Sequence, residues 1–141
     1  MESVTLTGTD LRLADVVAVA RGGARAAISD AALGRMRAAR AVADRAVAEG
    51  RAAYGVTTGV GMRKAFAVDS AVHDRLLIRQ HVIAQGPPAP RDVVRATALH
   101  LANALASGRT AARPELAEHV VQQLNGDRLP EPLFTPAYKA P

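Results

Sequence analysis

The alternation of apolar and polar residues divides the N-terminal part of the chain into short elements. Residues 4–7 alternate and are rich in β-branched side chains, which predicts a short strand. Thr9 and Asp10 then offer a cap for a helix over residues 11–20. Residues 26–28 are a second candidate strand. The chain is therefore expected to begin with one or two short strands around a helix.

A longer helix is predicted to follow Ser29 and Asp30, which can cap it, and to stop at Gly50. Its apolar residues recur at three- and four-residue steps, which is typical of a helix with one face in the core. They are Leu33, Met36, Ala39, Ala43, Ala46 and Val47.

Further helices are predicted over residues 70–85, 90–107 and 114–125. The second half of the middle one is apolar on nearly all sides, so we expect that helix to be central. The last should point three residues toward the core: Leu116, Val120 and Leu124.

From residue 127 the sequence is rich in proline and predicts an extended tail. The pattern thus indicates a mainly α fold with a domain over 1–126. The proline-rich tail, 127–141, is expected to pack on a partner chain.

One stretch fits neither a helix nor an ordinary strand. It reads Tyr-Gly-Val-Thr-Thr-Gly-Val-Gly over residues 54–61. Its glycines allow backbone angles that other residues avoid, and two β-branched threonines stiffen its middle. It predicts a shaped loop that presents a tyrosine, and a plain connector with Tyr54 at the edge of the core is the alternative.

Composition narrows the function. The 141 residues carry a net charge of +5 and contain no cysteine. The arginines are scattered among acids without a basic stripe or stacking aromatics, which argues against nucleic-acid binding. The four histidines lack metal-ligand spacing. No membrane span or signal peptide is recognised, and we expect a cytoplasmic protein.

Residues 54–61 resemble the tyrosine loop of the histidine, phenylalanine and tyrosine ammonia-lyases and related aminomutases. Val60 departs from the pattern, because the family usually has phenylalanine there. The order of later motifs is also similar over about residues 4–125. Residues 80–86 keep a histidine and a glycine, His81 and Gly86, and residues 103–113 keep Asn103, Leu105, Gly108 and Arg113.

The resemblance implies that Tyr54 is the general base that removes the β-proton of an amino acid, and that His81 positions the substrate or the electrophile. Phenols have a pKa of about 10, so such a base needs nearby cations or hydrogen-bond donors. The remaining candidates are expected to bind substrate or shape the loop: Gly55, Thr58, Gly59, Gly61 and Asn103. Arg63 and Lys64 are either an anion site or ordinary exposed cations.

The family's electrophile, methylidene-imidazolone, forms from an internal Ala-Ser-Gly followed by Asp-Leu. Ala106-Ser107-Gly108 has the right residues, but Arg109 and Thr110 follow it, and its register matches the end of the family's preceding helix. A Ser-Gly helix stop accounts for it. We therefore expect no cofactor in this chain, with methylidene-imidazolone supplied by a partner chain.

The leading hypothesis is a small subunit of a split ammonia-lyase-like enzyme. In it, a larger ammonia-lyase-like subunit supplies the electrophile and helical body of a hetero-oligomer that acts on a small molecule. One alternative is a lyase, dehydratase or cyclase that works without methylidene-imidazolone on a substrate other than an amino acid. The other is a non-catalytic structural or regulatory subunit.

Overall fold

The computed structural model describes residues 3–68 and 89–129. Strands β1 (Ser3–Leu6) and β2 (Arg25–Ile28) pair in parallel, with Val4 opposite Ala26 and Leu6 opposite Ile28. Helix α1 (Leu13–Ala20) crosses between them. Val4 and Leu6 are buried while Ser3 and Thr5 are exposed, so the strand pair is covered on one face.

Helix α1 begins two residues later than the sequence pattern predicts. Thr9 and Asp10 do not cap it, because the Thr7 hydroxyl donates to the Asp10 carboxylate in the turn after β1. Arg12 occupies the N-cap instead, and its backbone N–H donates to the Asp15 carboxylate at 2.9 Å.

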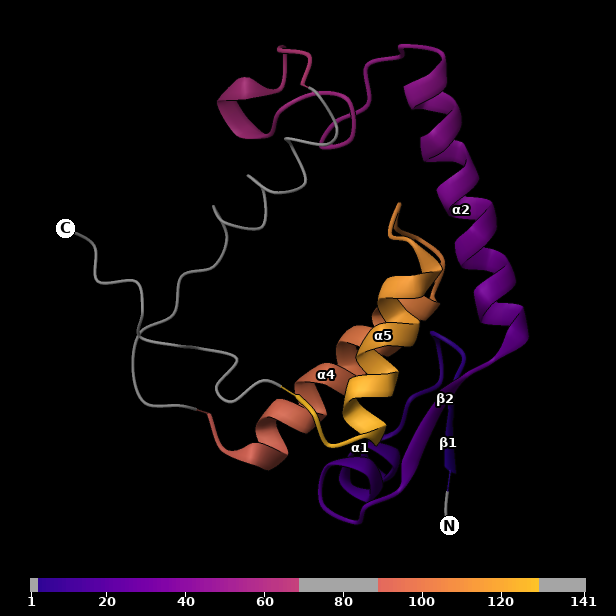
Figure 1. The fold of residues 1–141 in the computed structure, drawn as a ribbon, viewed down its shortest axis with the longest axis vertical. Helices are drawn as coiled ribbons and strands as arrows, with labels where there is room; N and C mark the ends of the chain where they lie inside the picture. Colours follow the sequence, from indigo (N-terminus) through magenta and orange to yellow (C-terminus); the bar gives the residue numbers. More distant parts are fainter. Residues whose placement is uncertain (1–2, 69–88, 130–141) are drawn as a thin grey trace, which may run out of the picture.

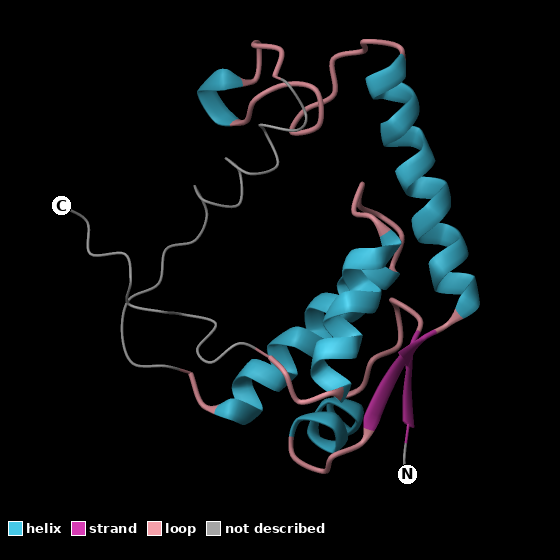
Figure 2. Cartoon of the chain, viewed as in Figure 1, coloured by secondary structure: helices cyan, strands magenta, loops and turns pink. Residues whose placement is uncertain are grey.

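Helix α4 (Arg91–Ala106) lies at the centre, as predicted. It contacts α1, both strands and α5 (Pro114–Asn125). Figure 2 shows these helices gathered beside the two strands. Residues from α1, both strands, α4 and α5 share one core: Val4, Leu6, Val19, Ala24, Ala26, Ala98, Leu99, Ala102, Val121 and Leu124.

One prediction for α5 is wrong. Leu116 is 48% exposed, because the helix turns Ala117, Val121 and Leu124 toward the core and so directs position 116 outward. Val120 is partly buried against that core.

Helix α2 (Asp30–Ala48) is capped by Ser29, whose hydroxyl accepts a hydrogen bond from Ala32 N–H at 3.2 Å. The strand pair, α1, α4 and α5 form the body of the molecule. The N-terminal half of α2 packs on this body through Met36, which shares a buried cluster with Leu105 and Ala117. Of the predicted stripe, Met36, Ala43 and Ala46 are buried, whereas Val47 is 39% exposed. The C-terminal half extends away from the other helices and leads to the segment that contains the tyrosine loop (Figure 1).

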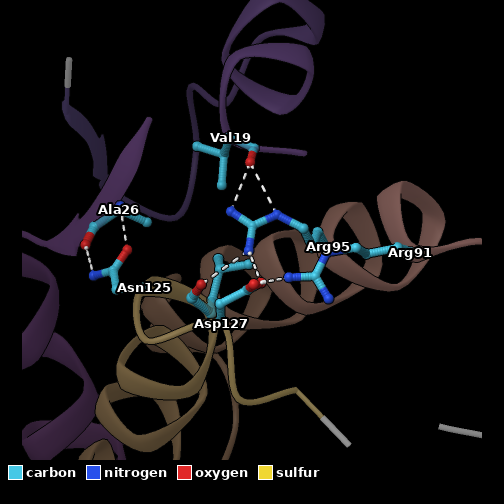
Figure 3. Close-up of polar contacts among 7 residues, drawn as sticks. Val19, Ala26, Arg91, Arg95, Asn125 and Asp127 are labelled. Carbon is cyan, nitrogen blue, oxygen red and sulfur yellow. Dashed lines mark hydrogen bonds and ion pairs between the residues drawn. The ribbon is translucent and has the colours of Figure 1, made fainter. Parts of the chain in front are cut away.

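Arg95 ties three helices together (Figure 3). Its guanidinium donates two hydrogen bonds to the carbonyl oxygen of Val19, at 2.9 and 3.2 Å, and one to the carbonyl oxygen of Leu124, at 3.0 Å. Arg95 also forms an ion pair with Asp127 at 3.1 Å, and the same carboxylate forms an ion pair with Arg91. Burial is the main cause that lowers the pKa of Arg95, with the charge of Arg91 as the second.

Asn125 closes the outer edge of β2. Its side-chain oxygen accepts from Ala26 N–H at 2.8 Å, and its side-chain nitrogen donates to the Ala26 carbonyl at 2.8 Å (Figure 3). The amide thus supplies the two bonds that another strand would make at this position.

The predicted helix over 70–85 and the tail beyond residue 129 lie outside the described residues. Within residues 3–68 and 89–129, no helix combines the length and the apolar character needed to cross a membrane.

Replacing Arg95 by methionine should lower the free energy of unfolding by about 1.5–3 kcal/mol, because helix-end carbonyls lose a charged donor. Urea denaturation followed by circular dichroism measures it. Arg21→Met is the control: Arg21 pairs with Asp92 at 2.8 Å, but its side chain is 71% exposed. Its loss should cost about 0–1 kcal/mol. Equal losses for the two variants would contradict the role assigned to Arg95.

Candidate functional site

The first half of the tyrosine loop is a tight turn closed by its own backbone. The carbonyl oxygen of Ala53 accepts from the N–H groups of Val56, Thr57 and Thr58 at 3.0, 2.9 and 3.2 Å. Gly55 sits within this turn at φ +69°. The Thr57 hydroxyl accepts from Ala53 N–H at 2.8 Å and donates to the Arg51 carbonyl at 2.6 Å. The Thr57 side chain therefore ties the turn to the residue at its start, Ala53, and to Arg51 just before it.

The second half folds back over the first. Gly59 N–H donates to the Phe66 carbonyl and Val68 N–H to the Thr57 carbonyl, each at 3.0 Å. Thr58, which is buried, forms an antiparallel bridge with Ala67. A Cβ on Gly59 would lie 2.7 Å from the Arg63 carbonyl oxygen, so this approach requires glycine. Residues 51–68 thus hold their own shape.

Tyr54 lies on the surface of this loop and is 66% exposed. It is therefore not a core-edge aromatic in the described structure. Its phenol oxygen accepts a hydrogen bond from the backbone N–H of Gly61 at 3.1 Å. Gly61 opens a short 3-10 turn, η1 (Gly61–Arg63), at φ +58°, a backbone angle that favours glycine.

The arrangement has a structural consequence for Tyr54. A backbone N–H directed at the phenol oxygen orients the Tyr54 side chain on the loop. The side chain as a whole is exposed on the loop surface.

The surface around Tyr54 is apolar and cationic. Met62 is 96% exposed and Phe66 is 67% exposed. Arg63 and Lys64 are exposed between them. The assignment of these two cations to an anion site stays a prediction.

The other predicted site residues do not gather at Tyr54. Asn103 is buried on α4, and its side-chain oxygen accepts from the N–H of Gly8 at 2.9 Å, in the turn after β1. His81 and Gly86 lie outside the described residues. In residues 3–68 and 89–129, the structure therefore presents the tyrosine loop by itself. Substrate binding by Gly55, Thr58, Gly59, Gly61 and Asn103 stays a prediction.

Residues 106–108 do not fit a methylidene-imidazolone. Forming that ring requires the Gly108 nitrogen to attack the Ala106 carbonyl carbon. Here Gly108 N–H donates to the Leu105 carbonyl at 3.1 Å, and the Ala106 carbonyl accepts from Arg35 at 3.3 Å. The Ser107 hydroxyl donates to the Ala104 carbonyl at 2.7 Å, and Gly108 has φ +70°. The tripeptide is the C-terminal stop of α4, as its register predicts.

Side chains that hold α2 were missed by sequence reasoning. Arg40 donates to the Ala111 carbonyl at 3.2 Å and to the Asp44 carboxylate at 2.8 Å. The four-residue spacing of Arg40 and Asp44 was a visible signal for their pairing. The link to Ala111 joins residues 71 positions apart, and no local pattern predicts it.

Beside this link lies an open hollow of about 550 Å³ between α2, the start of the tyrosine loop and the segment after α4. Its walls are mostly small apolar side chains: Ala39, Val42, Ala43, Ala46, Ala52, Ala53, Val56 and Ala111. No cluster of metal-binding side chains occurs among the residues that the structure describes.

Comparison with known proteins identifies the family to which these features belong. A family model described as aromatic amino acid lyase matches residues 11–131. The histidine ammonia-lyase of Streptomyces coelicolor is 35% identical over 133 residues, which are 92% of this chain and 26% of the relative. The histidine ammonia-lyase of Caldanaerobacter subterraneus is 37% identical over the same shares. The chain thus spans about a quarter of the length of these relatives.

Comparison with solved structures leads to the same family. The chain is similar to an ergothioneine-degrading enzyme, ergothionase, from Treponema denticola, with a TM-score of 0.83 and 35% identity. That match covers 88% of this chain and 26% of the other. A tyrosine aminomutase from Streptomyces globisporus gives a TM-score of 0.78 at 27% identity, over 89% of this chain and 24% of the other. With the tyrosine loop and the helical architecture both in place, the chain belongs to the aromatic amino acid lyase family and matches its N-terminal portion.

Proposed function

We propose that this chain supplies the base of an ammonia-lyase-like active site whose other parts come from a larger partner chain. The proposal rests on Tyr54, an exposed residue whose phenol oxygen accepts a hydrogen bond from the Gly61 N–H at 3.1 Å. A tyrosine kept only for packing needs neither exposure nor a donor aimed at its oxygen.

The proposed chemistry is an elimination from an aromatic or related amino acid. The Tyr54 oxygen accepts a proton from the carbon next to the one that carries the amino group. The electron pair of that C–H bond becomes a carbon–carbon double bond, and the amino group, in its protonated form, departs with the electrons of the C–N bond as ammonia. This chain's part is to hold the base and take the proton.

The partner is proposed because a complete reaction needs an electrophile for the amino group. Residues 106–108 form the C-terminal stop of α4, which supports a source outside this tripeptide. The larger subunit would supply the electrophile together with the helical body, and the enzyme would be a hetero-oligomer. The exposed Met62 and Phe66 give the tyrosine loop an apolar surface for contact with such a subunit.

Replacing Tyr54 by phenylalanine in the assembled enzyme should lower kcat by about 10²–10⁴-fold, because a positioned base is lost. Ammonia release, with the partner chain co-expressed, measures it. Leu116→Ala is the control, since it alters an exposed side chain on α5, outside the tyrosine loop, without removing a base. Unchanged turnover in Tyr54→Phe would favour a non-catalytic subunit, and lyase activity from the 141 residues alone would refute the divided site.

Replacing Thr57 by valine should loosen the loop, because valine keeps the shape of threonine but removes the hydroxyl that joins Ala53 and Arg51. A loss of about 1 kcal/mol corresponds to about 5-fold faster exchange of the loop amides. Hydrogen exchange read by mass spectrometry on residues 51–60 reports it. Thr57→Ser keeps the hydroxyl, so its loop amides should exchange like those of the original chain. Equal protection in the original chain, Thr57→Val and Thr57→Ser would show that the hydroxyl does not hold the loop.

A further inference from the structure

The tyrosine loop is joined to the body of the molecule through α2. The helix ends in a turn in which Gly50 N–H donates to the Val47 carbonyl at 3.1 Å and Arg51 N–H to the Ala46 carbonyl at 2.9 Å. Arg51 is also the residue whose carbonyl receives the Thr57 hydroxyl. Helix, turn and loop are therefore continuous, and the direction of α2 affects where the tyrosine loop lies (Figure 1).

The buried cluster that joins α2 to α4 and α5 lies in the N-terminal half of the helix. Met36 is buried against Leu105 and Ala117. Farther along, Ala43 and Ala46 are buried, but they line the hollow of about 550 Å³ between the helix and residues 108–111, so packing on that segment is incomplete. A contact of another kind bridges the helix to this segment.

Two arginines on α2 bind backbone carbonyls of the rest of the molecule. Arg35, one residue before Met36, donates to the carbonyls of Thr7, just after β1, and Ala106, at the end of α4. Arg40, more than one turn closer to the tyrosine loop, donates to the Ala111 carbonyl at 3.2 Å. Among the described residues, Arg40 makes the hydrogen bond between α2 and the body that lies farthest toward the loop.

Asp44 orients Arg40. Its carboxylate accepts from Arg40 Nε at 2.8 Å and lies 2.6 Å from Nη2. That hydrogen bond is the main cause that lowers the pKa of Asp44, and the charges of Arg40 and Arg113 act in the same direction. The planar guanidinium can hold the carboxylate on one side while Nη1 reaches Ala111, and a lysine ammonium lacks this fork.

We propose that Arg40 is a positioning residue: with Asp44 it holds α2 against Ala111 and so sets where the tyrosine loop lies relative to α4 and α5. Its importance for catalysis rests on the proposed function, in which Tyr54 is the base. Its effect on the position of the loop does not depend on that function.

The absence of cysteine allows a direct test, because two introduced cysteines can be labelled alone. Met62→Cys in the loop, at a 96% exposed position, and Leu101→Cys on α4, at a 47% exposed position, carry spin labels for a distance measurement by pulsed electron paramagnetic resonance. We expect one narrow distribution of distances between the two labels. Arg40→Met should change its mean distance or increase its width about twofold. Arg40→Lys, with a single point donor, should fall between the two.

Arg37→Met is the matched control. Arg37 is exposed on the same helix and makes no hydrogen bond or ion pair within the described part of the chain, so its removal should leave the distances unchanged. Distances in Arg40→Met equal to those of the parent would overturn the proposal. Circular dichroism checks the fold; if Arg40→Met does not fold, Asp44→Asn removes the orienting carboxylate and is judged by the same distances.

In the assembled enzyme, Arg40→Met should lower kcat with little change in KM, and Arg40→Lys should restore part of it. If Tyr54→Phe leaves turnover unchanged, the proposed function fails while the distances still decide the role of Arg40. If Tyr54→Phe abolishes turnover and the distances do not respond to Arg40→Met, the positioning role alone is wrong.

Discussion

The body of the molecule depends on one guanidinium placed where two helices end. The last carbonyl groups of a helix have no partner inside it and lie at the negative end of its dipole. Val19 is close to the end of α1 and Leu124 close to the end of α5, and Arg95 binds the carbonyl oxygens of both from a position on α4. Arg95 is largely shielded from water, with 13% of its side chain exposed, so these bonds compete weakly with solvent. The convergence of α1 and α5 on α4 places the core residues of all three helices in contact.

The tyrosine loop is organised differently. Its hydrogen bonds run between residues that are close in sequence, from Arg51 to Val68, and they use backbone groups and threonine hydroxyls. It has little core of its own, since Thr58 and Gly59 are buried at its centre while Tyr54, Met62 and Phe66 are exposed. Such a loop can keep its internal shape, yet its place in the molecule must come from what it is attached to. Shape and position are therefore set by separate sets of residues.

This division explains what the sequence could and could not predict. The strands, the central α4 and the shaped loop follow from periodicity and from glycine and threonine within short windows, and the structure has them. The start of α1 was placed too early because Thr9 and Asp10 look like caps, whereas Thr7 engages Asp10 in the preceding turn. Leu116 was placed inward because the pattern does not fix the rotation of α5, which depends on how Ala117 meets α2 and α4. The hydrogen bonds made by the arginine side chains could not be predicted from local patterns, since Arg95 and Val19, for example, are 76 positions apart.

The same division bears on how a site divided between chains would work. Reactive groups must lie within a few tenths of an ångström of their working geometry, and small misplacements cost large factors in rate. The Gly61 N–H bonded to Tyr54 orients the phenol within the loop, but it cannot place the loop against groups carried by another chain. That task falls to α2, whose far half lies beside a hollow and is held by Arg40 at Ala111. A directional hydrogen bond to a backbone carbonyl suits the task, because it fixes both distance and angle where apolar packing has left space. The tyrosine loop is thus locally ordered, and its working position depends on contacts that its own sequence does not contain.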